Sequence, residues 1–169
     1  VCTAEKREKN NIIDFIDYPV RIFPVGRLDK ESRGLIFLTN DGELSDALMR
    51  SRNGHEREYE VTVDRTIDRS FIDSMEKGVY LSELSLTTLP ARVKKLSSNR
   101  FSIILTQGLN RQIRRMCETL GYRVRDLKRI RIENVRLGDL PEGQYRKLSE
   151  KEEEGLRARL SRGSEERYG

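Results

Sequence analysis

Arg27 and Asp29 stand on either side of one leucine in the segment VGRLDKESRGLIFLTNDG, residues 25–42. Asp29 is soon followed by Ser32 and Gly34, so it falls in a turn that leads into the apolar run GLIFL. A carboxylate in such a turn is held rigidly and partly removed from water, and a nearby cation would keep it charged. Arg27 could be a surface partner or could point toward a ligand. Spacing alone favours an ordinary Arg–Asp surface turn.

A second candidate is the segment TQGLNRQIRRM, residues 106–116. It predicts a strand that ends at Thr106–Gly108 and a helix that begins at Leu109, with the backbone N–H groups of Gln107–Asn110 pointing outward toward an anion. Three arginines follow at i, i+3 and i+4, namely Arg111, Arg114 and Arg115. Like charges this close repel, so we expect negative groups among them: Asp29 for one, nucleic-acid phosphates for the others. The alternative is a helix edge open to water, which explains the clustering less well.

Tyr59 is the third candidate, at the start of the alternating segment REYEVTV. Its preceding neighbours are polar, so the ring could face a cleft and stack on a base. The alternative is a core tyrosine that shares the apolar face with Val61 and Val63. The residues alone therefore indicate an RNA-binding domain that contains one unusual aspartate.

Composition narrows the class of protein. The 169 residues are enough for one domain with a core, 36% of them are charged, and the net charge is +5. Basic residues concentrate between Arg111 and Arg136, which suits a polyanion such as RNA or, alternatively, a solvated helix face. The cysteines are isolated and His55 is the single histidine, which argues against a zinc site or a Cys–His nucleophile. We find no apolar run that could cross a membrane and no signal segment, and expect a cytoplasmic protein.

The pattern of apolar residues predicts an α+β fold with a mixed, mostly antiparallel sheet. GLIFLTN reads as a strand buried on both faces. The segment 161–169 reads as a tail with nothing to bury. The other predicted strands are 57–65, 86–96, 100–107 and 122–137, and the predicted helices are 12–18, 41–50, 66–78, 109–121 and 149–160. The SSN turn, 97–99, predicts a hairpin of two of these strands, and Thr66 or Asp68 would cap the helix that Gly78 ends.

Taken together, these segments resemble the bacterial RsuA/RluB/RluF group of rRNA pseudouridine synthases. GRLDKESRGLIFLTNDGEL resembles the group's central aspartate motif, EREYEVTV its tyrosine strand, and GLNRQIRRMCETLGYRVRDLKRIRI its arginine motif. LPEGQYRKL resembles the family's end, so that the likeness runs from about residue 21 to about residue 154. The segment QGLNRQIRRMCE is most similar to the RluF branch, which modifies large-subunit (23S) rRNA and in some members also a tRNA.

The resemblance implies that the chain isomerises a specific uridine of 23S rRNA, or also of tRNA, to pseudouridine. Asp29 would be the catalytic aspartate acting at the sugar, and Arg114 its salt-bridge partner. Tyr59 would stack on the base and help remove the C5 proton, and Ile113 would line the uracil pocket. Arg27 would fill the space left by the flipped nucleotide. The remaining substrate- or RNA-binding positions would be Asn110, Arg111, Arg115, Lys128, Arg129 and Arg131.

The resemblance also implies the pseudouridine synthase catalytic fold for residues 1–154, followed by a polar C-terminal tail, 155–169. The reaction rearranges one nucleoside, so we expect no metal and no cofactor, and a monomer whose partner is RNA. The family's S4-type domain and its first strand, with a Lys-Pro pair, have no counterpart here, so we expect the sheet to lack a strand and to leave an open edge. Two alternatives stay open: a catalytically inactive RNA-binding fragment and a structural ribosome-associated protein.

Overall fold

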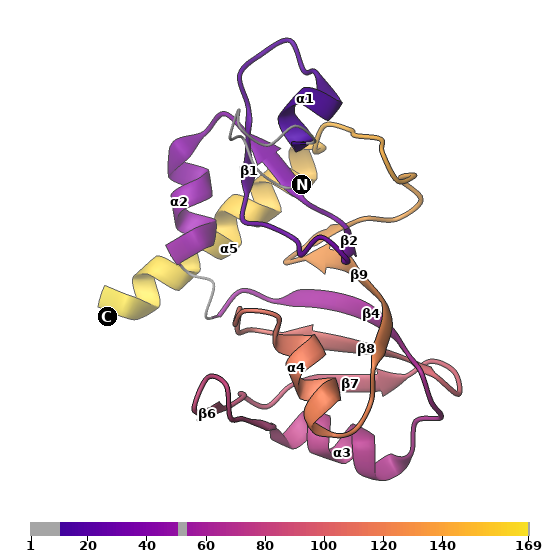
Figure 1. Cartoon of the computed structure of the whole chain (residues 1–169). Helices are drawn as coiled ribbons and strands as arrows, with labels where there is room; N and C mark the ends of the chain where they lie inside the picture. The colour runs from indigo at the N-terminus through magenta and orange to yellow at the C-terminus, as the bar shows by residue number, and fades with distance from the viewer. Residues whose placement is uncertain (1–10, 51–53, 169) are drawn as a thin grey trace.

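The computed structural model describes residues 11–50 and 54–168, with side chains as far as Arg162. The predicted α+β class is confirmed: the fold is built on a mixed, mostly antiparallel sheet (Figure 1). β2 (Arg33–Gly34) pairs in parallel with β9, and every other pairing in this sheet is antiparallel. The strand order is β10 (Val135–Arg136), β9 (Val124–Ile132), β4 (Arg57–Val63), β8 (Arg100–Leu105) and β7 (Arg92–Lys95).

β4 is the strand that the alternating sequence predicts, and it lies in the middle of the sheet. Val61 and Val63 are buried in the main core, against a face that also contains Phe101 and Ile103 of β8. Tyr59 of β4 lies opposite Ile103 of β8 on one side and opposite Arg129 of β9 on the other. The hairpin predicted from SSN is also present, because β7 and β8 pair antiparallel on either side of that turn.

Two helices, α3 (Arg69–Lys77) and α4 (Gln112–Thr119), contribute to the same core. α3 begins as predicted at Asp68, whose carboxylate accepts the Phe71 N–H at 2.8 Å, and it ends at Gly78. α4 buries Met116 and Cys117. Burial raises the pKa of the Cys117 thiol to about 12, so this cysteine is a core residue and no thiolate nucleophile.

The predicted start of α4 at Leu109 is wrong by three residues. Arg111 has a left-handed backbone, with φ of 51°, and the helix begins after it at Gln112. The Gln112 side chain accepts the Leu109 N–H at 3.2 Å. The loop that precedes α4 is therefore partly closed by the helix's own side chain, and its N–H groups are not all free for an anion.

Most of the remaining elements form a second part of the molecule, above the sheet in Figure 1. A short ladder joins β1 (Phe23–Val25) to β3 (Phe37–Thr39), and α2 (Gly42–Arg50) packs beside α5 (Glu150–Tyr168). Asp41 caps α2 by accepting the N–H groups of the next turn. α1 (Ile12–Ile16) also belongs to this second part. β5 (Tyr80–Leu81) and β6 (Leu86–Thr87) pair with each other near α3 at the other end of the molecule, where Leu81 is buried in the main core.

The prediction of a polar tail over 155–169 is wrong. α5 continues through this segment, and Leu156 and Leu160 are buried against Leu48 of α2. Two leucines four residues apart lie on one side of a helix, which is enough to anchor an otherwise charged segment. The domain boundary predicted after residue 154 therefore falls inside a helix that belongs to the fold.

The single strand predicted for 34–40 is also wrong, because the segment divides into β2 and β3. Gly34 has φ of +115°, and a Cβ there would lie 2.2 Å from the Arg129 carbonyl oxygen. The Leu35 N–H then bonds to that oxygen at 2.8 Å, and the chain turns away to pair with β1. Neither short strand is fully buried on both faces.

The expected missing strand before Val1 concerns a region outside the described residues. Among the helices of the described part of the chain, none is long and apolar enough to span a membrane.

Candidate active site

A cleft of about 680 Å³ lies between the sheet and the second part of the molecule. Its walls come from the turn that follows β1, from α2, from the middle of β4 and β9, and from the loop before α4. Residues far apart in the sequence therefore meet there. The predicted site residues that line the cleft are Arg27, Asp29, Tyr59, Asn110, Arg111, Ile113 and Arg129.

Asp29 lies in the predicted turn, which is closed by a hydrogen bond from the Ser32 N–H to the Asp29 carbonyl at 2.9 Å. Its carboxylate is 3.9 Å from the Arg111 guanidinium, and its side chain is 29% exposed. Arg111 also pairs with Glu31 at 3.2 Å. The backbone N–H of Glu31 and then Arg111 hold the pKa of the Glu31 carboxyl below its usual range. Arg111 is thus shared between two carboxylates of one turn.

The predicted ion pair between Asp29 and Arg114 is not formed in this structure. Arg114 is buried, and its Nη2 donates to the Ser32 hydroxyl at 3.1 Å. Because Arg111 has a left-handed backbone before the helix, it is set off from the helical turn of Arg114, and the two guanidinium groups reach different partners. Arg114 consequently braces the turn through Ser32, a residue whose role the sequence did not suggest.

Arg115 and Asn110 close the loop before α4. The Arg115 guanidinium donates to the Asn110 carbonyl and to its side-chain oxygen, both at 2.9 Å. The predicted cluster of three guanidinium groups on one side of the helix is therefore wrong: each of these arginines has its own partner.

Tyr59 satisfies both of its predicted environments. Its half-buried ring packs against the main core, and it also lines the cleft. This is possible because β4 crosses from the core to the cleft wall along one face of the strand. An aromatic ring that is fixed on one side and open on the other can stack on a nucleobase.

Arg129 and Arg131, two of the residues of β9 that were predicted to bind substrate or RNA, are buried. Arg129 is 6% exposed, and its Nε donates to the Leu35 carbonyl at 2.8 Å. Arg131 is also buried and donates to the Glu133 carbonyl at 2.6 Å and to Glu56 at 3.2 Å. Arg131 is therefore a structural residue and is not available to an RNA phosphate, whereas Lys128 is half-buried at the side of the strand.

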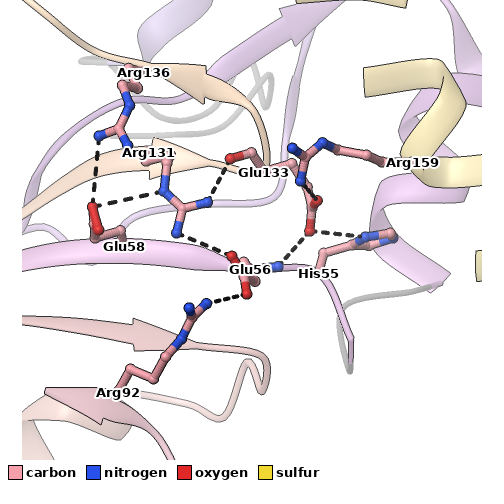
Figure 2. A network of polar contacts seen from close by, with 8 residues as sticks. All are labelled: His55, Glu56, Glu58, Arg92, Arg131, Glu133, Arg136 and Arg159. Atoms are coloured by element: carbon pink, nitrogen blue, oxygen red, sulfur yellow. Dashed lines mark hydrogen bonds and ion pairs between the residues drawn. The ribbon is translucent and has the colours of Figure 1, made fainter. Parts of the chain in front are cut away.

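Figure 2 shows the polar network around Arg131, which the sequence did not predict. The buried carboxylate of Glu133 lies 3.4 Å from His55 Nδ1 and 3.2 Å from Arg159 of α5. Burial raises the pKa of Glu133, but hydrogen bonds from His55, the Glu56 N–H and Arg159 outweigh it, and the pKa lies below its usual range. Through the ion pair of Arg159 with Glu133, the network joins α5 to the end of β9. Its members are separated by up to about a hundred residues, so no local pattern reveals them.

The cleft thus contains a carboxylate, an aromatic ring, an apolar side chain and several guanidinium groups. Such a set can bind a nucleotide, with the ring against the base and the cations near phosphates, and can place the carboxylate at the sugar. Within the described residues no group of three or more His, Cys, Asp or Glu side chains is placed to bind a metal ion.

Comparisons with known proteins agree with this chemistry. The sequence model of a family described as RNA pseudouridylate synthase matches residues 2–119. The chain is 51% identical, over 152 residues, to the dual-specificity RNA pseudouridine synthase RluF of Escherichia coli K12; this covers 90% of the chain and 52% of the relative. It is 35% identical to ribosomal large subunit pseudouridine synthase B of Bacillus subtilis, over 96% of the chain and 70% of that protein.

A solved structure is also similar. A crystal structure of a pseudouridylate synthase superposes with a TM-score of 0.81 at 32% identity, covering 86% of this chain and 65% of that one. The chain spans about half the length of the RluF relatives that it matches.

Proposed function

The chain belongs to the RNA pseudouridylate synthase family, and we propose on that basis that it isomerises a uridine of RNA to pseudouridine. The observation that supports the proposal most is the cleft, whose lining brings together Asp29, Tyr59 and Ile113. These residues come from three separate segments, and each segment matches one of the motifs that the sequence shares with the family.

In this proposal Asp29 acts at the sugar of a uridine that has been flipped into the cleft. The C1′–N1 bond breaks, the base turns, and it rejoins the sugar through C5. Tyr59 stacks on the base and assists removal of the C5 proton, and Ile113 forms the apolar wall of the uracil site. Arg114 supports Asp29 indirectly in the structure described here, through Ser32.

The cationic residues at the cleft would bind the RNA chain. Arg27 is exposed at the rim and can fill the space that the flipped nucleotide leaves. Asn110 and Arg111 line the cleft, whereas Arg115 of α4 and Lys128 of β9 are not part of its lining; all four would contact the RNA backbone. Arg111 could exchange its exposed carboxylate partners for a phosphate, since surface ion pairs contribute little free energy.

The proposed substrate is large-subunit (23S) rRNA, with a tRNA as a second substrate. The Escherichia coli relative is named a dual-specificity enzyme, and the Bacillus subtilis relative acts on the ribosomal large subunit. The higher identity to the first relative favours both substrates over rRNA alone.

The test is tritium release from 5-tritiated uridine in a large-subunit rRNA transcript, and in a tRNA transcript, with the parent chain and Asp29→Asn. We expect release by the parent and a loss on the order of a thousandfold in the variant, because the carboxylate acts directly at the sugar. Asp73→Asn, which changes an exposed aspartate of α3, is the matched control and should release tritium like the parent.

A second candidate is a catalytically inactive RNA-binding domain, which is favoured by the missing ion pair between Asp29 and Arg114, since the Arg114 guanidinium bonds to Ser32 instead. Salt-sensitive binding of the transcript with no tritium release by the parent would support this alternative and would overturn the proposed activity.

A further inference from the structure

Arg129 is a buried guanidinium in the wall of the cleft that leaves most of its donors unused. Of the five N–H groups that an arginine carries, the one on Nε donates to the Leu35 carbonyl. Nη2 has no hydrogen-bond partner, and in the described part of the chain no carboxylate forms an ion pair with Arg129 within 4.0 Å. A buried cation without an anion is costly, so the arrangement indicates a ligand that supplies an oxygen acceptor.

The position of Arg129 is fixed from two sides. Its cross-strand neighbour in β4 is Tyr59, and both line the cleft. On the other side Gly34 packs directly on the Arg129 backbone, whose carbonyl accepts the Leu35 N–H at 2.8 Å. The guanidinium is therefore held in place before any ligand arrives, beside the ring proposed to stack on the base.

We propose that Arg129 donates a hydrogen bond to a carbonyl oxygen of the flipped uracil and stabilises the charge that this oxygen acquires during the reaction. The proposal rests on the function proposed above and adds a specific catalytic contact to it. A flipped nucleotide enters base first, while its phosphate stays with the RNA chain at the opening. A side chain that is 6% exposed is thus placed for the base rather than for the phosphate.

The chemistry gives that contact a purpose. When the C1′–N1 bond breaks, its electron pair leaves with the base, and the negative charge spreads over N1, O2 and O4. This holds whether Asp29 bonds to C1′ or takes the C2′ proton and later returns it. C5 then uses the pair to bond to C1′, which releases Asp29 if it was bonded there. The C5 proton passes through a base to water and N1 takes up a proton, so that the product is neutral pseudouridine. Arg129 stays protonated throughout; it is a donor aimed at developing charge.

The experiment compares parent and Arg129→Gln on three large-subunit rRNA transcripts, made with uridine, with 2-thiouridine or with 4-thiouridine. Conversion is measured by nuclease digestion and chromatography of the nucleosides.

On the uridine transcript we expect kcat to fall on the order of a hundredfold with KM for the transcript unchanged. On the transcript with sulfur at the contacted carbonyl, the same substitution should lower kcat only about tenfold. Sulfur is a poor hydrogen-bond acceptor, so the parent already gains less from this contact and has less to lose. Effects of sulfur on RNA folding cancel, since each ratio compares two proteins on one RNA.

Arg131→Gln is the matched control. It removes another buried guanidinium from β9, one that is bound within the network of Figure 2, and should lower activity by the same factor on all three transcripts. Equal losses for Arg129→Gln on all three would overturn the proposal, as would a change in KM alone, which would place the contact at a phosphate. If Arg129→Gln does not fold, Arg129→Lys is used, with a smaller loss expected in the same pattern. A parent that converts no uridine refutes the proposed function instead.

Discussion

Arg111 and Arg114 support the turn of Asp29 in different ways, although they are three residues apart. Arg114 is buried and holds the turn's backbone in position through the Ser32 hydroxyl. Arg111 is 38% exposed and shares its charge between Asp29 and Glu31. The shape of the turn therefore depends on a contact inside the protein, while its charge is balanced by a side chain that an RNA phosphate can attract away.

Glu133 is the residue for which the structure predicts a clear pH effect. Its pKa in the folded protein lies below the ordinary value of 4.5, with hydrogen bonds from His55, the Glu56 N–H and Arg159 overcoming the effect of burial. A carboxyl whose pKa is lowered on folding stabilises the protein above pH 4.5, and this contribution is lost as the pH falls through the folded value. Glu133→Gln should lower the free energy of unfolding by roughly 1–3 kcal/mol at pH 7.

The measurement is urea unfolding of the parent and of Glu133→Gln between pH 7 and pH 3. The difference between them should shrink as the pH falls below about 4.5. Glu154→Gln, at an exposed position of α5, should match the parent at every pH. A difference that stays constant across the range would show that the carboxylate's charge contributes nothing.

At the level of single elements, β2 depends on one glycine. Gly34→Ala would place a methyl group 2.2 Å from the Arg129 carbonyl oxygen, at φ of +115°. We expect a loss of about 3 kcal/mol or more in the free energy of unfolding, because backbone must move. Gly121→Ala is the control: φ is also positive, +85°, but no atom lies within 4 Å, and the cost should be only about 1–2 kcal/mol. Similar costs for the two variants would refute the role of the close contact.

α5 supports the second part of the molecule through two leucines. Leu156 is fully buried against Leu48, which also lines the cleft. Leu156→Ala should lower the free energy of unfolding by about 2–4 kcal/mol in thermal or urea unfolding. Lys151→Ala, at an exposed position of the same helix, should change it by less than about 0.5 kcal/mol. An equally small effect for Leu156→Ala would mean that α5 is dispensable for the fold.

The sequence predicted elements whose signals are local. Alternation identified β4, and Asp68 with Gly78 bounded α3, since these patterns report on side chains within one element. The predictions were wrong where the backbone departs from the regular pattern, as at Arg111 before α4. They were also wrong where a strand distant in sequence determines the local structure: the contact of Gly34 with the Arg129 backbone divides the segment 34–40 into two strands. The repulsion among the three arginines already predicted that Asp29 would lie close to one of them, and the family resemblance added Tyr59 and Ile113 to the cleft. Which arginine pairs with Asp29, namely Arg111, could not be deduced from spacing.

The whole molecule carries a net charge of +5. Arg27, Asn110 and Arg111 line a cleft that opens between its two parts, and Lys128 lies on β9, a strand that forms part of the cleft wall. RNA affinity should therefore fall steeply with salt, as counterions are released from the RNA. Lys128→Ala should lower the slope of log Kd against log salt by about 1. Arg69→Ala removes the same charge from α3, outside the cleft, and should leave the slope unchanged. Filter-binding titrations at several salt concentrations measure both; equal slopes for the two variants would exclude Lys128 from the interface.

The contact between Gly34 and Arg129 also has a genetic consequence. Most damaging core substitutions can be rescued by a second change, because a neighbouring side chain can shrink or grow. Here the obstructing atoms are the backbone oxygen, nitrogen and carbon of Arg129, which every amino acid possesses. No substitution at a partner position removes them. Suppressor selection that starts from Gly34→Ala should therefore return true revertants at codon 34, and glycine at this position is fixed by geometry even if the chemistry of the cleft were to change.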